Sequence, residues 1–217
     1  DLGGRVRVLV LTGAGRAFCS GQDLGDGGNA AQLDLERTLR EEYEPLLRAI
    51  HDAPVPVIAA VNGAAAGAGA SLALAADVVI AAESAVFIQA FARIGLIPDA
   101  GGTWMLPRQV GFARAMGAML FAEPVSAVQA AQWGMIWEAV PDDAFDAHWR
   151  ARASALAQGP TLAYRQIRRA LRQSLSSTLD DQLAREARLQ AEAGRTRDFR
   201  EGVLAFLEKR PAQFEGR

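Results

Sequence analysis

A wholly apolar segment followed by a run of small residues limits the fold most strongly. Val57–Val61 reads Val-Ile-Ala-Ala-Val, and a short continuous apolar run is typical of a strand buried on both faces of a parallel sheet. The next stretch, Asn62-Gly-Ala-Ala-Ala-Gly-Ala-Gly-Ala70, opens with a turn and leads into an expected helix over 67–75. Small side chains let that helix pack close to another backbone. The pattern therefore predicts an α/β fold.

Further strands and helices follow from periodicity and from Gly and Pro breaks. We expect strands over 5–11, 77–82 and 135–140, and a short extended segment around 86–87. A charged amphipathic helix is expected over 33–51, with an apolar face made of Leu35, Leu39, Tyr43, Leu46, Leu47 and Ile50. Residues 21–31 are rich in Gly and Asp and predict a loop.

Helical patterns dominate from about residue 103. Breaks are expected at 111, 123–124 and 134, and Ser126 with Gln129 forms a candidate capping box. From Pro141 onward the pattern is entirely helical, with breaks near 159–160, 176–177 and 194. We therefore predict an α/β core over 1–140 and a helical region over 141–217.

Composition excludes several classes of protein. The 217 residues are 50% hydrophobic and 22% charged, with a formal net charge of −2, which suits one globular domain with at most a small appendage. This balance gives neither a basic footprint for nucleic acid nor an electrostatic membrane anchor. The longest apolar stretch, 64–76, is too short to span a bilayer. Because Cys19 is the single cysteine, no internal disulfide forms, and we expect a cytoplasmic protein.

Several familiar catalytic motifs are missing. The Gly13-x-Gly15 pair lacks the third glycine of a dinucleotide fingerprint, because Phe18 stands there. His51 and His148 with one cysteine do not make a metal cluster, so no metal site is predicted. No Walker lysine follows a glycine run, and no Gly-x-Ser-x-Gly elbow occurs.

Three stretches remain as candidates for chemistry. The first, Phe18-Cys-Ser-Gly-Gln-Asp23, can turn a backbone N–H outward after a strand, or be a plain tight turn. The second, 62–70, offers the free N–H groups of a helix start, or only close helix–strand packing. The third, 93–104, holds Asp99 in an apolar, Gly-rich turn, where it is a proton carrier or a turn-capping aspartate. Together they suggest two amides that bind an acyl oxygen beside a carboxylate.

These three stretches, in this order and spacing, resemble the enoyl-CoA hydratase/isomerase (crotonase) superfamily. The resemblance also includes Asp77 and runs from about Arg5 to the C-terminus. It implies a crotonase-like spiral of ββα units with a helical C-terminal trimerisation region, and hence a homotrimer or a dimer of trimers. The family has another strand and helix before the first strand predicted here, and we expect that these are missing from this chain.

The resemblance also implies the site residues. Carried over by position, the oxyanion hole consists of the backbone N–H groups of Gln22 and Ala68, with Asp99 as the catalytic carboxylate. The substrate is a coenzyme A thioester, and no cofactor is bound permanently. Ser20 is a candidate CoA contact. Phe206 and Lys209 are candidate contacts to a neighbouring subunit's CoA, or else belong to an ordinary amphipathic helix.

Departures from the family pattern narrow the expected activity. Hydratases of the family place glutamates at the positions of Ser71 and Phe91, and adding water across a double bond uses both carboxylates. The single carboxylate Asp99 fits isomerisation instead. The segments 66–73, 90–99 and 201–211 are similar to the isomerases of phenylacetate degradation, which convert ring-1,2-epoxyphenylacetyl-CoA to oxepin-CoA.

Other activities stay open at this point. Related enzymes shift double bonds in enoyl-CoA chains. A hydratase, a thioester hydrolase or an aryl-CoA dehalogenase would use the same oxyanion hole, although a dehalogenase also needs an activating histidine in the pocket. A non-catalytic acyl-CoA-binding protein is the alternative from another class. An apolar setting that includes Phe91 and Trp104 is expected to raise the basicity of Asp99.

Overall fold

The computed structural model describes residues 6–23 and 34–217 and divides the chain into two compact units. The helical unit comprises Asp1–Leu9, Pro54–Pro56 and Arg150–Arg217. The sheet unit comprises Val10–Ala53 and Val57–Trp149. Within the described ranges, no helix is both long enough and apolar enough to cross a membrane. The predicted α/β class is confirmed. The predicted loop over 21–31 lies mostly outside the described residues.

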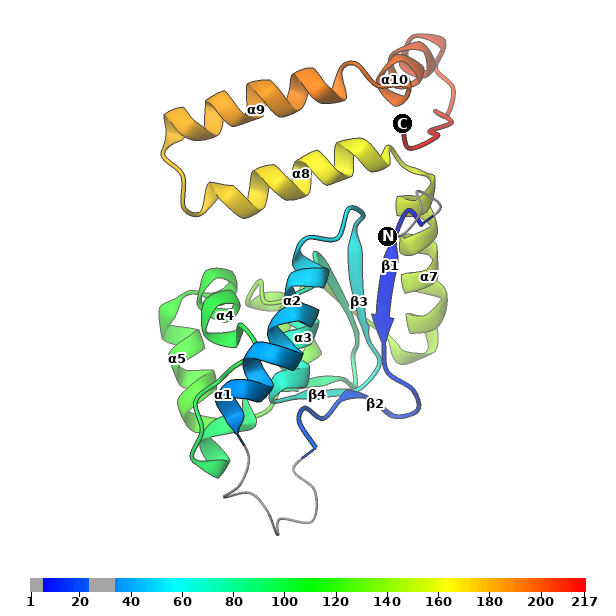
Figure 1. The fold of residues 1–217 in the computed structure, drawn as a ribbon. Helices are drawn as coiled ribbons and strands as arrows, with labels where there is room; N and C mark the ends of the chain where they lie inside the picture. The colour runs from blue at the N-terminus through cyan, green and yellow to red at the C-terminus, as the bar shows by residue number, and fades with distance from the viewer. Residues whose placement is uncertain (1–5, 24–33) are drawn as a thin grey trace. The chain divides into compact units, whose positions relative to one another are not determined.

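Two four-stranded sheets form the frame of the sheet unit (Figure 1). The first has the order β1-β3-β5-β8, and its strands are Leu9–Thr12, Val57–Val61, Val78–Ala82 and Glu138–Val140. The second has the order β2-β4-β6-β7, and its strands are Ala17–Cys19, Ala64–Ala66, Val86–Ile88 and Val125–Ser126. The pairs β3–β5, β5–β8, β2–β4 and β4–β6 are parallel, whereas β6–β7 is antiparallel.

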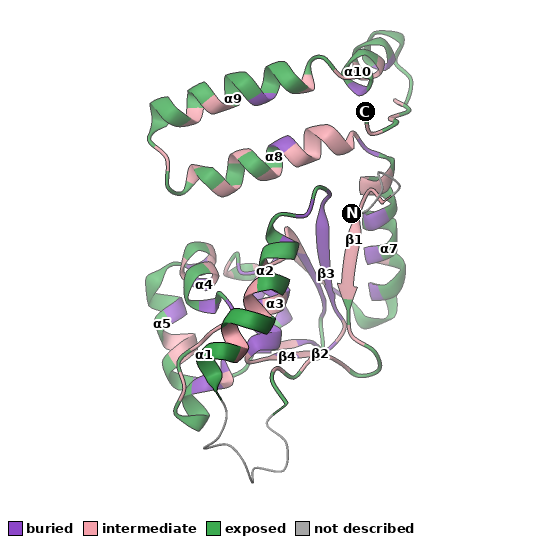
Figure 2. Cartoon of the chain, in the orientation of Figure 1, coloured by how far each residue is buried: buried purple, intermediate pink, exposed green. Residues whose placement is uncertain are grey.

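Strand β3 lies in the centre of the core. All five of its residues are buried, and Ile58 to Val61 pair in register with Val78 to Ala81 of β5 (Figure 2). Val57 N–H also donates to Asp77 Oδ2 over 2.8 Å, so this aspartate ties the starts of the two strands together. The prediction of a strand buried on both faces is confirmed.

Two strands and the starts of two others differ from the prediction. The first strand begins at Leu9 rather than at residue 5, and the strand predicted over 135–140 begins at Glu138. Strands β4 and β7 were not predicted, because alanine is depleted in strands and a Val-Ser pair is too short to show an alternating pattern. Their neighbours in the second sheet hold them in extended form.

The helices of the sheet unit follow the predicted pattern. The amphipathic segment is α1 (Leu35–Thr38), a π-helical turn η2 (Leu39–Tyr43) and α2 (Glu44–His51). The others are α3 (Ala68–Leu74), the 3₁₀ helix η3 (Ala90–Ile94), α4 (Gly102–Val110), α5 (Phe112–Phe121) and α6 (Ala127–Gln132), and α7 (Asp142–Gln158) continues into the helical unit. The predicted cap of α6 is confirmed, since Ser126 Oγ accepts a hydrogen bond from Gln129 N–H over 3.2 Å.

The helical unit contains α8 (Thr161–Ser174), α9 (Leu179–Ala193) and α10 (Arg197–Glu208). Arg7 joins the first residues to this unit, because its guanidinium donates to Thr161 Oγ1 and to the carbonyls of Gly159 and Phe214. Buried Asp198 accepts hydrogen bonds from the N–H groups of Glu215 and Gly216. These bonds fasten the last residues to α10.

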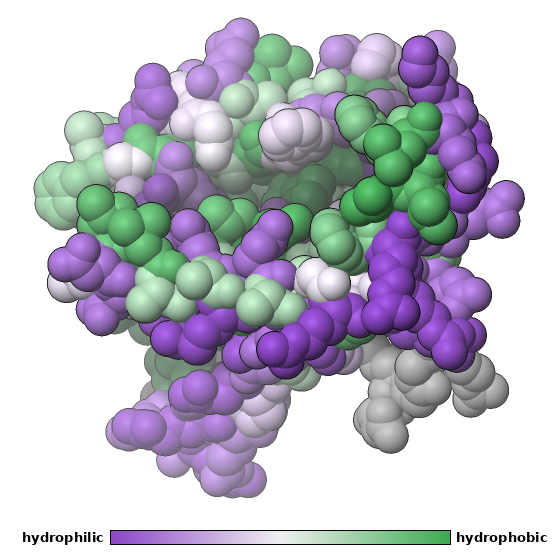
Figure 3. All heavy atoms as spheres, turned by 90° about the horizontal axis from the view of Figure 1, so that it is seen from above, coloured by the Kyte–Doolittle hydropathy of each residue, from purple (hydrophilic) through white to green (hydrophobic). Residues whose placement is uncertain are grey.

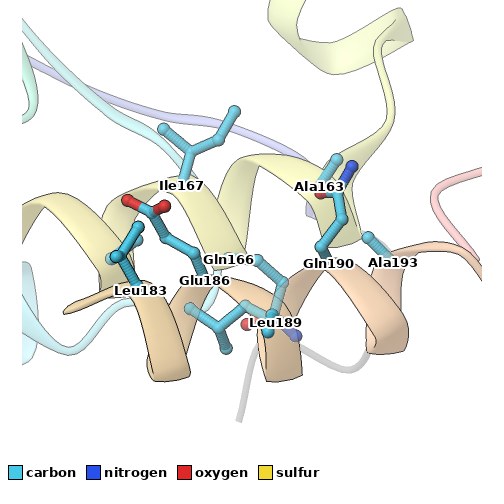
Figure 4. Close-up of a pocket in the computed structure, with 10 residues that line it drawn as sticks. Ala163, Gln166, Ile167, Leu183, Glu186, Leu189, Gln190 and Ala193 are labelled. Atoms are coloured by element: carbon cyan, nitrogen blue, oxygen red, sulfur yellow. The ribbon is translucent and has the colours of Figure 1, made fainter. Parts of the chain in front are cut away.

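An open groove of about 540 Å³ runs between α8 and α9 (Figure 4). Apolar and small side chains of both helices line it, among them Ala163, Ile167, Leu183 and Leu189. Several large apolar side chains of α8 to α10 are exposed, and Figure 3 shows that apolar residues interrupt the hydrophilic ones on the face it presents. Exposed apolar surface of this kind marks a candidate contact with another protein surface.

Candidate active site

Two of the three predicted stretches, 18–23 and 62–70, lie with their backbones in contact. Gly21 has a φ of +95°, and a β-carbon placed on it would lie 3.0 Å from Ala66 O and 3.3 Å from Ala68 N. A side chain there would be strained and crowded, so the turn needs glycine. The backbone that follows β2 therefore passes directly beside the start of α3, as the proposed pair of amides requires.

Helix α3 packs equally closely against β2. A β-carbon on Gly69 would lie 2.3 Å from Cys19 O, which no real structure tolerates without a shift. The small-residue run thus serves close helix–strand packing and also brings the first N–H groups of α3 next to the Gly21 turn. The two interpretations of this run, free N–H groups at a helix start and close helix–strand packing, are therefore compatible with each other.

An apolar cluster borders the start of α3. Buried Ala68, Phe91 and Ala100 pack together, with Tyr43, Leu47 and Leu96 against them. Gly67, with a φ of +55°, precedes α3, and a β-carbon placed on it would lie 3.9 Å from Cζ of the Phe91 ring. Trp104, which was expected to help surround Asp99, lies outside this cluster of described residues. Its ring is half exposed and carries the Arg108 guanidinium at 4.3 Å.

Asp99 lies in a strained turn that leads into α4. Its carbonyl accepts a hydrogen bond from Gly102 N–H over 2.8 Å. The next two residues, Ala100 and Gly101, both adopt left-handed conformations, with φ of 48° and 77°. Such a conformation costs alanine of order 1 kcal/mol and persists only where its surroundings impose it. The turn fixes the backbone from which the Asp99 side chain extends.

The Asp99 carboxyl is partly buried, and its Oδ1 has no hydrogen-bond partner among the described residues. Burial raises the pKa of this carboxyl above the ordinary value for an aspartate, because the charged form loses hydration. The raised pKa makes the carboxylate a stronger base than an exposed aspartate. An aspartate that only capped a turn would be expected to have its oxygens occupied by backbone N–H groups.

The positions of the two hydratase glutamates border the same turn. Ser71 is fully buried, and Phe91 belongs to the apolar cluster. A β-carbon on Gly102 would lie 2.7 Å from Ser71 Oγ and 3.6 Å from Gln89 Oε1. Both side chains have polar atoms without partners among the described residues. Gln89, 3% exposed, was not singled out from the sequence, although a lone amide after an apolar strand is a usable signal.

Tyr43 is the second residue that the sequence analysis did not assign to the site. It was counted as part of an apolar helix face, yet its hydroxyl donates to Gln22 Oε1 over 2.7 Å. Burial raises the pKa of this phenol, and the negative charge of Asp99 raises it further. The hydroxyl therefore stays protonated at neutral pH, close to the Asp99 carboxylate.

The predicted CoA contacts lie in different places. Ser20 is exposed in the segment that precedes Gly21. Phe206 lies on α10 of the helical unit with 82% of its surface exposed, and Lys209 ends that helix in a left-handed conformation with a φ of 54°. These three assignments stay predictions.

The two histidines lie beside other carboxylates. His51 Nδ1 is 2.8 Å from Asp52 Oδ1, and His148 Nε2 is 2.8 Å from Glu138 Oε1. Among the described residues, no group of three or more His, Cys, Asp or Glu side chains is placed to hold a metal ion.

Comparison with known proteins identifies the family. The family model described as Enoyl-CoA hydratase/isomerase matches residues 3–217. The chain belongs to this enoyl-CoA hydratase/isomerase family. The family assignment agrees with the site geometry, in which the Gly21 turn lies beside the start of α3, and Ala100, next to Asp99, packs in the cluster that contains Ala68.

Members of the family are similar over almost the whole chain. A Rhodobacter capsulatus protein named "Probable enoyl-CoA hydratase" is 68% identical over 99% of this chain and 83% of its own length. The 1,2-epoxyphenylacetyl-CoA isomerase of Escherichia coli is 50% identical over 98% of this chain and 82% of its own. The crystal structure of an enoyl-CoA hydratase from Polaromonas sp. JS666 superimposes with a TM-score of 0.91 at 34% identity, covering 98% and 83% of the two chains. The predicted crotonase fold is confirmed.

Proposed function

We propose that this family member is an acyl-CoA isomerase that converts ring-1,2-epoxyphenylacetyl-CoA to oxepin-CoA and shifts double bonds in enoyl-CoA chains. One observation carries the proposal. Asp99 is a partly buried carboxyl with a raised pKa, whereas Ser71 and Phe91 occupy the positions of the hydratase glutamates. Moving a proton within one substrate needs one carboxylate, while activating water and delivering its proton uses two.

The proposed mechanism begins at the thioester. Its oxygen accepts hydrogen bonds from the N–H groups of Gln22 and Ala68, which stabilise the negative charge of an enolate. The Asp99 carboxylate takes a proton from carbon next to the thioester and returns it to another carbon of the same substrate. In the epoxide, the electrons of the enolate form a double bond between the α-carbon and the ring, and the carbon–carbon bond shared by the epoxide and the six-membered ring breaks. The ring double bonds shift, and the proton returns to the ring carbon at the end of this shift, which gives the seven-membered oxepin. No water is added, so substrate and product have the same composition.

Coenzyme A enters only as part of the substrate in this proposal. Ser20 would contact it, and Phe206 and Lys209 would contact the CoA of a neighbouring subunit. The exposure of Phe206 and the exposed apolar side chains of α8 to α10 support a homotrimer or a dimer of trimers. We place the enzyme in the cytoplasm, with no nucleic acid or membrane as partner and no permanently bound cofactor.

Hydration is the second candidate. It is favoured by the 68% identical relative from Rhodobacter capsulatus, whose name denotes a hydratase. Other family chemistry and a purely acyl-CoA-binding role have less support. A dehalogenase needs an activating histidine, and both histidines lie beside carboxylates outside the Asp99 turn.

Mass spectrometry of the products separates these activities. The full-length protein would be incubated separately with epoxyphenylacetyl-CoA, 3-enoyl-CoA and 2-enoyl-CoA. Isomerisation leaves the mass of the acyl-CoA unchanged while its ultraviolet spectrum changes, whereas hydration adds the mass of one water and hydrolysis releases free CoA. We expect mass-neutral conversion of the first two substrates. Hydration of 2-enoyl-CoA as the dominant activity would overturn the proposal.

A further inference from the structure

A π-helical turn brings Tyr43 to the candidate site. The segment α1–η2–α2 changes from α- to π-helical geometry over Leu39–Tyr43, where Glu44 N–H donates to Leu39 O five residues back. The extra residue in this turn rotates the side chains that follow it relative to those before it. Turns of this kind are rare and are found frequently at functional sites. Tyr43 is the last residue of the turn.

Tyr43 contacts both the apolar cluster of the candidate site and the Gln22 side chain. Its ring packs, beside Leu47, on the cluster that contains Ala68, which supplies one proposed oxyanion donor, and Ala100, which follows Asp99. Its hydroxyl donates to the side-chain oxygen of Gln22, whose backbone N–H is the other proposed donor. One side chain thus links the Gln22 side chain to the cluster that includes Ala68 and the residue next to Asp99.

Gln22 has few other restraints. It is exposed, in the segment that follows the Gly21 turn. Its amide group also donates to Asp23 O, but over 3.4 Å, which is long for a hydrogen bond. The 2.7 Å bond from Tyr43 is therefore the shortest tie that the structure gives this side chain.

We propose that Tyr43 is a positioning residue that holds Gln22 so that its backbone N–H points at the thioester oxygen. This inference rests on the proposed oxyanion hole but not on the choice between isomerisation and hydration. An oxyanion donor stabilises the transition state because its N–H group already points at the oxygen before the reaction. Complete loss of one donor lowers kcat by a factor on the order of 10²–10³. Loosening Gln22 without removing its N–H should therefore lower kcat by about tenfold.

A double-mutant cycle tests this role. Tyr43→Phe removes the hydroxyl but keeps the ring, and Gln22→Ala removes the acceptor but keeps the backbone N–H. We expect each single variant to lower kcat by about tenfold, with a smaller change in KM, and the double variant to be no worse than either. The matched control is Tyr164→Phe, the same chemical change on α8, which should leave kcat unchanged and whose melting temperature shows the effect of the substitution alone.

Two outcomes overturn the inference. Wild-type kcat in Tyr43→Phe shows that the hydroxyl has no role, and multiplied losses in the double variant show that it acts on the substrate rather than through Gln22. The cycle is measured on whichever acyl-CoA reaction the protein performs. A failure of the isomerase proposal is therefore visible separately, in the wild-type product.

A spectroscopic measurement extends the test to binding alone. Hydrogen bonds in an oxyanion hole lower the carbonyl stretching frequency of a bound thioester. The infrared spectrum of a bound, unreactive acyl-CoA such as butyryl-CoA should therefore show a smaller shift in Tyr43→Phe than in wild type. An equal shift in the two proteins contradicts the positioning role even if turnover is slow.

Discussion

Two aspartates, one in each unit, show how differently the two regions treat a carboxyl group. Asp198 in the helical unit is 3% exposed and accepts hydrogen bonds of 2.7 and 2.9 Å from two backbone N–H groups. Asp99 in the sheet unit has a buried oxygen without a partner among the described residues. A carboxylate whose two oxygens both accept hydrogen bonds, as in Asp198, stabilises the fold. A carboxylate with an oxygen left without a hydrogen bond, as in Asp99, is able to accept a proton from a substrate.

The surroundings of the two aspartates differ in the same way. Around Asp99 the chain uses small residues and left-handed turns, and the side-chain polar atoms of buried Ser71 and Gln89 have no hydrogen-bond partner within the part of the chain that the structure describes. The helical unit instead uses side-chain caps at Thr178 and Thr196 and ion pairs such as Glu201–Arg210. In the sheet unit, polar groups near the proposed chemistry thus lack hydrogen-bond partners among the described residues. In the helical unit, the polar groups at the helix ends form hydrogen bonds or ion pairs.

The largest expected effect comes from Asp99→Asn. Asparagine keeps the shape of the side chain but does not accept a proton, so we predict that kcat falls by about 100-fold or more. The measurement is steady-state turnover of 3-enoyl-CoA. Asp198→Asn is the control from the helical unit, and folded protein of this variant should turn over at close to the wild-type kcat. Equal losses in the two variants would remove the functional contrast between the aspartates.

Glycine substitutions test the packing side of the comparison. Gly69→Ala places a β-carbon 2.3 Å from Cys19 O and should lower the free energy of unfolding by about 3 kcal/mol. Gly202→Ala on α10 meets only the Phe214 ring at 3.5 Å and should raise it by about 0.5–1 kcal/mol through better helix propensity. Urea unfolding measures both. A harmless Gly69→Ala would show that β2 and α3 do not need their close approach.

The stability of the two aspartate variants should differ in sign. In Asp198→Asn, the NH₂ group of the new amide lies against one of the two backbone N–H donors and does not accept its hydrogen bond. This substitution should therefore lower the free energy of unfolding by about 1–2 kcal/mol. Asp99→Asn should be as stable as wild type or more stable at neutral pH. Burial raises the Asp99 pKa in the folded state, so stability is lost as pH rises through that pKa, and asparagine avoids the loss. Thermal unfolding at neutral and acidic pH should show that the stability advantage of Asp99→Asn over wild type shrinks as pH falls.

The smallest effect concerns the end of the chain. Hydrogen bonds from Arg210 and from Gln213 N–H lower the pKa of Glu201 to about 2. Its contribution to stability is therefore present above the ordinary pKa of 4.5 and is lost as pH falls toward about 2. Glu201→Gln should melt slightly below wild type at neutral pH, and the two curves should converge at the acidic end. A gap that persists there would mean that the charge is not the source of stability.

The sequence predicted the framework of both units from patterns that act locally. The buried β3, the capped α6 and the helix breaks near residues 159 and 194 follow from periodicity, caps and Gly or Pro. Strand β4 did not, because Ala64–Ala66 becomes extended only between β2 and β6. Its β-structure comes from tertiary pairing rather than from its own residues.

The candidate site was predictable in part. Asp99, Gln22 and Ala68 are assigned from their motifs and stay predictions, whereas the structure shows that the Gly21 turn and the start of α3 come together. Tyr43 was read as part of an apolar face, because an ideal helical period does not show a π turn. The meeting of its hydroxyl with Gln22 joins residues 21 positions apart, and no local pattern encodes that contact.

The pH dependence of isomerisation by wild type and Asp99→Asn, measured side by side, tests the central claim most directly. If Asp99 moves the proton, wild-type kcat/KM falls as pH is lowered through a pKa above the ordinary value for an aspartate. The residual rate of Asp99→Asn should lack that fall. Profiles of the same shape and height in the two proteins would contradict the assignment of Asp99 as the catalytic base.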